Sequence, residues 1–331
     1  MLVVNRQDVE RALSMPAAIA AMRGVLVALD EGRAIQPLRS SFELPRSSDR
    51  CYLMPAYAGS PASLGVKVLT AVHGNAGTPF DVHQGAVLLF GAHGELLALI
   101  DATSITATRT AAVSAVATHA LARPDATRLA ILGAGAQAES HLKAMACVRP
   151  VAHVSVWSRT GEHAERFARV ARERSGIVVE VCASIDAAVR DADIICTTTA
   201  AHAPILRAGL VRRGAHINAV GSGSPSHREL AGEVVRDARV FVDRLESALN
   251  EAGDIVLAIA EGSISAGHVI GEIGAVLTAR AEGRSSADEI TLFKSVGLGA
   301  EDVAAARAIY AECLRTGSGA RVAFGTGPSL V

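Results

Sequence analysis

The chain has 331 residues, 50% of them hydrophobic, and a formal net charge of −1. This length allows two domains, and the near-neutral charge excludes the basic field with which proteins attract nucleic acid. The five cysteines lie far apart, without the spacing of a metal site or a disulfide framework, which favours reduced thiols in a cytoplasm. We expect neither a signal peptide nor a membrane-spanning segment, because acids and arginines interrupt the N-terminal apolar residues.

The N-terminal part of the chain predicts an antiparallel or mixed sheet accompanied by helices. A short strand at residues 1–4 precedes a helix at about 16–32, and glycine-rich segments predict turns at 74–77 and 91–94. The further elements expected here are strands at 40–44, 50–57, 64–73, 86–90 and 96–101 and an alanine-rich helix at about 104–121.

A strand at residues 128–132 leads into a motif that is typical of dinucleotide binding. Gly133, Gly135 and Ala138 have the spacing G-x-G-x-x-A at the start of a helix. The first glycine permits a tight turn, the second lets the backbone approach a pyrophosphate, and the alanine lets helix and strand pack closely. The helix N-terminus offers N–H groups and a positive dipole end to phosphates. Glycines of a tight turn without a ligand are the alternative, but the surrounding pattern favours nucleotide binding.

Strands alternate with helical segments after this motif and predict a doubly wound parallel sheet of about six strands. Residues 245–331 add alanine-rich helices, the last of which follows the segment 289–302 and runs to about residue 314. We therefore expect an α/β protein with a Rossmann-type domain at 122–302 and a second α/β domain formed by 1–121 and 303–331. The strands expected after 128–132 are 151–157, 177–181, 192–199, 216–220 and 239–242.

The end of the second strand indicates which nicotinamide cofactor is bound. The acidic residue that usually holds the adenosine 2′-hydroxyl is missing. Ser158, Arg159 and Thr160 instead provide two hydroxyls and a cationic fork, which suit a 2′-phosphate. We expect NADP(H), with NAD(H) as the second possibility; a solvated loop arginine is the alternative interpretation.

Two cations lie in apolar segments of the N-terminal part. Lys67 is within an expected strand and Arg109 within the alanine-rich helix, each without a charged neighbour in sequence. Because a buried unpaired cation costs several kcal/mol, each needs an anionic partner. That partner is either a salt bridge or a bound carboxylate, and a dinucleotide fold in the same chain favours a carboxylate-bearing substrate. Arg39, before a strand, is a weaker third candidate.

These segments together resemble the ornithine cyclodeaminase/mu-crystallin family over nearly the whole chain. The resemblance implies a substrate and dimerisation domain, and hence a homodimer joined through residues 1–120. It also implies that Lys67, Arg109 and, more loosely, Arg39 bind the substrate carboxylate. The segments that carry the resemblance are 65–67, 106–115, 133–138, 218–221, 228–230 and 293–297. The cofactor-binding residues expected from the motif and the resemblance are Gly133, Gly135, Ala136, Gln137, Ala138, Ser158, Arg159, Thr160, Thr110, Val220, Gly221 and Ser222. No metal ligands are expected.

The loop after residue 221 departs from the cyclodeaminases of this family. Gly223 stands where they carry an aspartate that handles the amino groups of the substrate. The chain is more similar to members that reduce cyclic ketimines. We therefore expect NAD(P)H-dependent reduction of an imine next to a carboxylate, such as 1-pyrroline-2-carboxylate or 1-piperideine-2-carboxylate, to an L-amino acid. Lys67 would bind the carboxylate or donate the proton.

Other functions remain open at this stage. The substrate could be acyclic, as in alanine or N-alkyl amino acid dehydrogenation or iminosuccinate reduction, or the reaction could be ornithine cyclodeamination. Outside the enzymes, a crystallin-like protein could use NADP(H) only to shape a ligand site. The expected partners are a small carboxylate-bearing substrate and a second copy of the chain, with no nucleic acid and no membrane.

Overall fold

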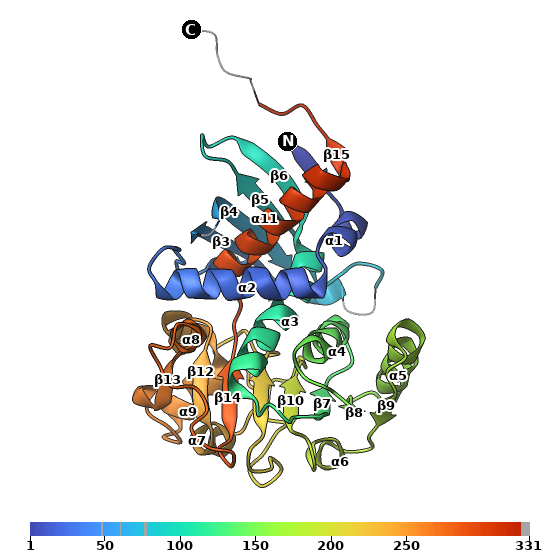
Figure 1. Cartoon of the computed structure of the whole chain (residues 1–331), viewed down its shortest axis with the longest axis vertical. Coiled ribbons are helices and arrows are strands. Elements are labelled where there is room, and N and C mark those ends of the chain that lie inside the picture. The colour runs from blue at the N-terminus through green and yellow to red at the C-terminus, as the bar shows by residue number, and fades with distance from the viewer. Residues whose placement is uncertain (48, 60, 76–77, 326–331) are drawn as a thin grey trace. The chain divides into compact units, whose positions relative to one another are not determined.

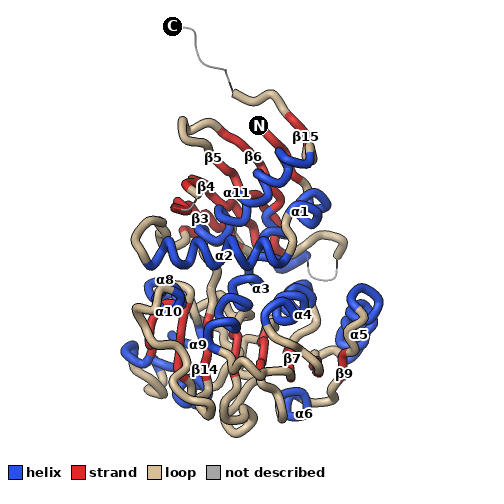
Figure 2. Tube along the Cα trace, viewed as in Figure 1, coloured by secondary structure: helices blue, strands red, loops and turns tan. Residues whose placement is uncertain are grey.

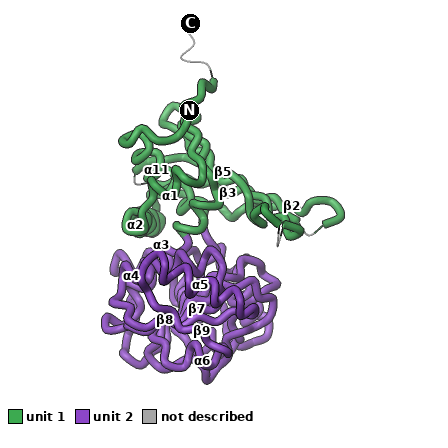
Figure 3. Tube along the Cα trace, turned by 90° about the vertical axis from the view of Figure 1, so that its right-hand side faces the viewer, with its two compact units in different colours: residues 1–109, 298–331 green, residues 110–297 purple. Residues whose placement is uncertain are grey.

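A computed structural model describes residues 1–47, 49–59, 61–75 and 78–325; Figure 1 labels the helices and strands, and Figure 2 distinguishes them from the loops. The chain divides into two compact units, which Figure 3 colours separately. Unit 1 consists of residues 1–109 and 298–331, and unit 2 of residues 110–297.

The division falls inside helix α3 (Ala102–Leu121), so the unit boundaries differ from the predicted 121 and 303. Side-chain contacts explain the difference. Arg109 pairs with acids of unit 1, as described below, whereas Ser114 forms a hydrogen bond with His141, and Thr118 accepts one from Asn218. The alanine-rich sequence predicts the helix but carries no mark of where its partners change.

Unit 1 contains, in its described residues, a mixed sheet of seven strands in the order β15-β1-β6-β5-β4-β3-β2. Strands β1 and β6 are parallel and all other neighbours are antiparallel, which confirms the predicted mixed sheet. The strands are β1 (Leu2–Val4), β2 (Ser40–Glu43), β3 (Arg50–Gly59), β4 (Ala62–Ala71), β5 (His83–Phe90), β6 (Leu96–Asp101) and β15 (Ala320–Arg321). The turn predicted at 74–77 lies partly outside the described residues.

Helix α11 (Gly299–Thr316) lies along one face of this sheet, next to α2 (Met15–Asp30) (Figure 1). The contact is close at Gly65 of β4, where an added Cβ atom would be 2.8 Å from Val303 of α11. Side chains two residues apart in a strand point to the same face, so Lys67 also points toward α11. A short helix that the sequence did not predict, α1 (Arg6–Ala12), follows β1.

Among the described residues, no single helix has the length and hydropathy needed to cross a membrane. The bent pair of α1 and α2 passes the same test only when the two are taken together, across a bend of 82°.

Unit 2 contains, in its described residues, a sheet of eight parallel strands in the order β13-β12-β14-β11-β10-β7-β8-β9. From β7 the chain proceeds outward to β8 and β9 and then returns to β10 on the other side of β7, which confirms the doubly wound fold. Such sheets bind ligands at the carboxyl ends of the strands where the order reverses. The strands are β7 (Arg128–Leu132), β8 (His153–Trp157), β9 (Val179–Val181), β10 (Ile194–Thr197), β11 (His216–Ala219), β12 (Arg239–Val242), β13 (Val269–Glu272) and β14 (Thr291–Lys294).

The prediction of about six strands was too low, because β13 and β14 were not recognised. Strand β14 lies between β11 and β12, and all four of its residues are buried, as is usual in a parallel sheet. It was missed because it is short and ends in Lys294, whose charge is paired with Asp254 at 2.9 Å. A partner 40 residues earlier in the chain leaves no local pattern.

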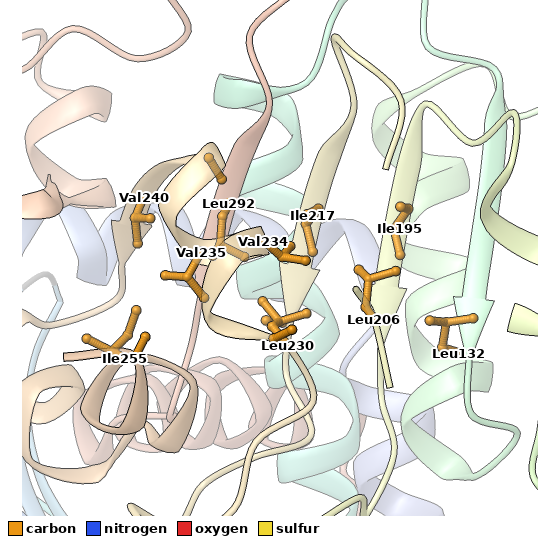
Figure 4. Close-up of a cluster of buried hydrophobic side chains, with 14 of the residues drawn as sticks. Leu132, Ile195, Leu206, Ile217, Leu230, Val234, Val235, Val240, Ile255 and Leu292 are labelled. Atoms are coloured by element: carbon orange, nitrogen blue, oxygen red, sulfur yellow. The ribbon is translucent and has the colours of Figure 1, made fainter. Parts of the chain in front are cut away.

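Helices cover both faces of the unit 2 sheet (Figure 2). One face packs in an aliphatic cluster to which Leu132, Ile195, Ile217 and Leu292 of the strands contribute (Figure 4). Burying each such side chain contributes about 1.5–3 kcal/mol, so this cluster makes the sheet a rigid base for the loops at its edges. The helices of the unit after α3 are α4 (Ala136–Val148), α5 (Gly161–Ser175), α6 (Ile185–Val189), α7 (Gly232–Asp237), α8 (Leu245–Glu251), α9 (Gly253–Ala260) and α10 (Ile273–Leu277).

Candidate functional site

A buried group of charged side chains lies in unit 1 where β4, α3 and the start of α11 meet. Lys67 is 1% exposed and Arg109 is 5% exposed. Arg109 donates from Nε to Asp302 Oδ1 and from Nη1 to Glu301 Oε2, both at 2.9 Å. Lys67 Nζ donates to Thr106 Oγ1 at 2.6 Å and to Asp302 Oδ1 at 3.3 Å. We call Lys67, Arg109, Glu301 and Asp302 the clamp cluster.

Local structure explains why the two acids are placed there. Glu301 and Asp302 are in the first turn of α11, where the helix dipole stabilises negative charge. Glu301 also accepts the N–H of Leu298 at 3.2 Å, which caps the helix. Oδ2 of Asp302 is buried and accepts no hydrogen bond from the described residues. Asp302 therefore retains one acceptor for a donor from a ligand.

The sequence left open whether Lys67 and Arg109 pair with acids of the chain or with a bound carboxylate. The structure shows a salt bridge for each of them. The acids that form these bridges, Glu301 and Asp302, were missed as site residues because 192 to 235 positions separate them from their cations. Two adjacent acids opening a helix, in a chain with two locally unpaired cations, were the available indication.

The environment of Lys67 changes its acidity. Burial lowers the pKa of Lys67 from 10.5 to about 8; the charge of Asp302 opposes this shift, and the charges of Arg109 and Arg39 add to it. Burial is the largest of these causes. A lysine with a pKa of about 8 is protonated in most molecules at neutral pH and can still release its proton near pH 8.

Arg39 belongs to the same region of unit 1. It is half-buried and directly precedes β2, and its charge contributes to the lowered pKa of Lys67. In the strand register, Ser41 pairs with Tyr52 and Met54 pairs with Lys67. Continuing this register by one step puts Arg39 on the same face as Lys67. The structure thus brings the three predicted cations together.

The glycine loop of unit 2 joins β7 to α4 at the point where the strand order reverses. Gly133 has φ +114°, and an added Cβ atom there would lie 2.7 Å from the Thr198 carbonyl oxygen, so only glycine fits. Gly135 is the N-cap of α4 and has open space where a Cβ would be. Ala138 is fully buried. These three positions have the properties that the motif predicts.

The N-terminal N–H groups of α4, where Ala136 and Gln137 lie, have no side-chain cap. Thr110 is 8% exposed within α3, and its side chain forms no hydrogen bond with the glycine loop in the described part of the chain. The predicted phosphate site at α4 therefore has an open helix end, and the contact of Thr110 with a cofactor phosphate stays a prediction.

Ser158, Arg159 and Thr160 follow β8, the neighbour of β7. Arg159 is exposed and forms no ion pair or hydrogen bond with any described residue. Thr160 is the N-cap of α5, and its hydroxyl makes no capping hydrogen bond. The two hydroxyls and the guanidinium are therefore grouped at the carboxyl end of β8.

Val220, Gly221 and Ser222 follow β11 on the same edge of the sheet, and Gly221 N donates to Glu229 Oε2 at 2.8 Å. Glu229, Asp254 and Lys294 are all 0% exposed, and we call these three residues the loop cluster. The sequence identified segments 228–230 and 293–297 only by resemblance and gave Glu229 no role. No group of His, Cys, Asp and Glu among the described residues could hold a metal ion.

Comparisons with known proteins agree with this architecture. A sequence profile of the ornithine cyclodeaminase/mu-crystallin family matches residues 1–317. The chain is 36% identical to a Delta(1)-pyrroline-2-carboxylate reductase of Bacillus cereus over 98% of this chain and 100% of the relative. It is 40% identical to the ketimine reductase mu-crystallin of Mus musculus, over 85% and 86% of the two chains. The structure of Thermococcus litoralis Delta(1)-pyrroline-2-carboxylate reductase in complex with NADH and L-proline has a TM-score of 0.95 at 36% identity, with 97% and 100% of the chains covered.

Proposed function

Because this chain belongs to the ornithine cyclodeaminase/mu-crystallin family, we propose that it is an NAD(P)H-dependent reductase of cyclic ketimines that carry a carboxylate. Its substrates are 1-pyrroline-2-carboxylate and 1-piperideine-2-carboxylate, and its products are the corresponding cyclic L-amino acids. The cofactor supplies the hydride that adds to the imine carbon, and the nitrogen receives a proton. The observation that carries the proposal is the clamp cluster, in which a lysine with a pKa of about 8 is buried beside a second cation.

Charge supports a carboxylate ligand at this cluster. Lys67 and Arg109 balance the carboxylates of Glu301 and Asp302, and Arg39 adds one further positive charge. Three cations are therefore close together in this region, and a substrate carboxylate is a ligand that suits them. Holding the substrate in one orientation is what hydride transfer gains most from, since positioning can supply about 7–11 kcal/mol of a barrier.

Lys67 has the acidity of the proton donor in this reaction. A protonated imine is the better hydride acceptor, and an acid whose pKa lies near the working pH transfers protons most effectively. Two hydrogen bonds, to Thr106 and Asp302, account for two of the three N–H donors of its ammonium group. The third is the one that we assign to the imine nitrogen.

The cofactor preference is for NADP(H). The support is Arg159, which is exposed and unpaired among the described residues, together with the hydroxyls of Ser158 and Thr160 at the end of β8. A 2′-phosphate would receive a charge-assisted, forked contact there.

The experiment that tests this function is a substrate panel followed by cofactor oxidation. NADPH and NADH are each offered with the two cyclic ketimines, and separately with 2-keto acids plus ammonia or methylamine. Fast NADPH oxidation with the cyclic ketimines supports the proposal. Turnover confined to the acyclic mixtures would instead assign an amino acid dehydrogenase, and cofactor binding without turnover would assign a ligand-binding protein.

We also propose a homodimer in a cytoplasm. The five cysteines are free, which suits a reducing compartment. Phe42, Leu53 and Leu64 are 56%, 39% and 49% exposed and share, by register, the sheet face opposite Lys67. An exposed apolar surface of this kind is typical of a protein interface. Light scattering at micromolar concentration should give twice the chain mass of 34.1 kDa, and a monomer would contradict this assignment.

A further inference from the structure

One buried carboxylate joins two loops at the carboxyl edge of the unit 2 sheet. Glu229 Oε1 accepts hydrogen bonds from Thr199 N at 2.6 Å and from Thr199 Oγ1 at 2.7 Å. Its Oε2 accepts from Thr197 Oγ1 at 2.6 Å and from Gly221 N at 2.8 Å. Thr197 ends β10, Thr199 lies in the loop after it, and Gly221 follows β11, so a single side chain fixes the exits of two neighbouring strands.

The same contacts continue to the glycine loop. Thr198 donates to the carbonyl oxygen of Leu132 from N at 2.8 Å and from Oγ1 at 3.1 Å, and it closes the space beside Gly133. At the other end, a Cβ atom on Gly221 would lie 2.1 Å from the Thr199 carbonyl oxygen. The loops after β7, β10 and β11 are therefore in continuous contact, and Glu229 holds the middle loop to the last.

A stack of two imidazole rings is a second tie between these loops. His202, after β10, and His227, after β11, have ring centroids 3.8 Å apart and planes 7° from parallel. This contact adds to the hydrogen bonds of Glu229 and makes the two loops behave as one surface.

The segment that carries Glu229 is itself supported from α9. Asp254 Oδ1 accepts the backbone N–H groups of Glu229 and Leu230, both at 2.8 Å. Lys294 Nζ lies 2.9 Å from Asp254 Oδ2 and donates to the Ser222 carbonyl oxygen at 2.7 Å. The loop cluster thus fixes mostly backbone groups, and it reaches both Gly221 and Ser222.

We propose that Glu229 is a positioning residue for hydride transfer: it fixes the loops after β10 and β11 as the surface against which the nicotinamide half of the cofactor lies. This inference rests on the proposed function, because it requires a nicotinamide cofactor at the carboxyl edge of this sheet. Glu229 touches neither cofactor nor substrate in this scheme and acts through the backbone of Thr199 and Gly221.

A glutamine cannot replace Glu229, although it has the same size. Each carboxylate oxygen accepts one backbone N–H and one threonine hydroxyl. Whichever way an amide is turned, its NH₂ group faces a backbone N–H that cannot accept a hydrogen bond. The loop with that N–H must move, and displacements of about 1 Å can cost about 100-fold in rate.

The test compares Glu229→Gln with Asp193→Asn in the full-length protein. Asp193 is 5% exposed and also accepts two backbone N–H groups, those of Thr127 and Arg128, each at 3.0 Å, but at the amino edge of the same sheet. For each variant, kcat and KM are measured for ketimine reduction, together with the primary isotope effect from NADPH deuterated at the transferred position. Folded protein is quantified by thermal melting, and cofactor binding by fluorescence of Trp157, the sole tryptophan.

For Glu229→Gln we expect kcat per folded molecule to fall about 100-fold, the ketimine KM to stay within about threefold, and the isotope effect to rise because hydride transfer becomes slower. Asp193→Asn should lower the melting temperature without changing kcat or the isotope effect. Thr197→Val, which removes one of the four donors, should change kcat and the isotope effect in the same direction by less. It replaces the glutamine variant in the test if that variant does not fold.

Two results would overturn the inference but not the proposed function. One is an unchanged kcat per folded molecule in both Glu229→Gln and Thr197→Val, and the other is a loss of kcat in Asp193→Asn equal to that in Glu229→Gln. Failure of the wild-type protein to oxidise NADPH with any ketimine overturns the proposed function and the inference with it.

Discussion

The two buried charge clusters of this protein differ in what their side chains hold. In the clamp cluster of unit 1, Lys67 and Arg109 contact carboxylates and a hydroxyl, so side chains hold side chains. In the loop cluster of unit 2, Glu229 and Asp254 accept backbone N–H groups, and Lys294 donates to a backbone carbonyl. The first arrangement gathers charged side chains, whereas the second fixes the backbone of the loops.

The two clusters also differ in their charges and in the pKa values of their side chains. The clamp cluster has two cations and two carboxylates, and its lysine has a lowered pKa, to which the charge of Arg39 contributes. The loop cluster has two carboxylates and one ammonium group; burial and the nearby Asp254 raise the pKa of Glu229. A group of cations that includes a lysine with a lowered pKa suits an anionic ligand, and a buried carboxylate surrounded by N–H groups suits the fixing of loops. The account therefore assigns chemistry to unit 1 and geometry to unit 2.

The largest expected effect comes from breaking the clamp cluster at Arg109. Arg109→Ala leaves two buried carboxylates short of a partner, which should lower the free energy of unfolding by about 3–5 kcal/mol. It should also lower kcat/KM for the ketimine by roughly 30- to 1,000-fold, equivalent to about 2–4 kcal/mol. Arg109→Lys should be nearly as damaging, because a point charge does not reproduce a fork. Denaturant titration and steady-state kinetics measure both effects.

A matched control is Arg315→Ala, which removes an exposed arginine paired with Glu312 in the same helix that opens with the clamp acids. It should leave stability and kinetics unchanged. NADPH binding, followed through Trp157, should survive in Arg109→Ala. If that variant loses stability but keeps its kcat/KM per folded molecule, Arg109 is a structural residue and the clamp hypothesis ends.

The next effect concerns a cation that belongs to neither cluster. Arg159→Asp should weaken NADPH binding about 10- to 100-fold, the equivalent of about 1.5–3 kcal/mol for a lost charge-assisted contact. NADH lacks the 2′-phosphate, so its binding should change little. Titration of each cofactor, followed by Trp157 fluorescence, gives the ratio of variant to wild-type Kd for NADPH and for NADH. Equal ratios for the two cofactors would refute a 2′-phosphate site.

The smallest expected effect sharpens the geometry of unit 2. Gly221→Ala forces a methyl group against the Thr199 carbonyl oxygen and the Glu229 carboxyl group, at 2.1 and 2.6 Å. Overpacking of this kind costs about 1–3 kcal/mol, and the displaced loop should weaken cofactor binding. Gly223→Ala is the control, because a Cβ atom at Gly223 meets nothing within 4 Å. Indistinguishable stability and cofactor affinity in the two variants would show that the contact at Gly221 is not a constraint.

The open space at Gly223 also bears on the sequence argument. A Cβ atom at this position would meet nothing within 4 Å, so backbone packing does not impose the glycine. The glycine is therefore to be explained by the chemistry of the site and not by packing.

Patterns within a short stretch predicted much of the fold. Strands 96–101, 128–132 and 239–242 have the predicted ends, because each is an apolar run between turn residues or charges. Strand β14 was missed because its final residue is a lysine that only the folded chain neutralises. The boundary at 109 was missed because it lies inside one uniform helix.

In the candidate site, too, local patterns were predictable from the sequence and long-range contacts were not. Lys67 and Arg109 could be identified because each is a lone cation in an apolar segment. Their partners Glu301 and Asp302 are acids at the start of a helix, a common position for acids. Glu229 lies in segment 228–230, and its neighbours in sequence do not indicate what it binds. Long-range pairing decides all three roles, and a single sequence contains no record of it.

The most direct test of the account is the pH dependence of kcat/KM for reduction of 1-pyrroline-2-carboxylate by NADPH. Only the protonated form of Lys67 donates a proton, and its pKa is about 8. The account predicts a constant kcat/KM below pH 8 and a tenfold loss per pH unit above it, and in Lys67→Arg a low kcat/KM without this break. A profile that stays flat above pH 8, or a break that survives in Lys67→Arg, would contradict proton donation by Lys67.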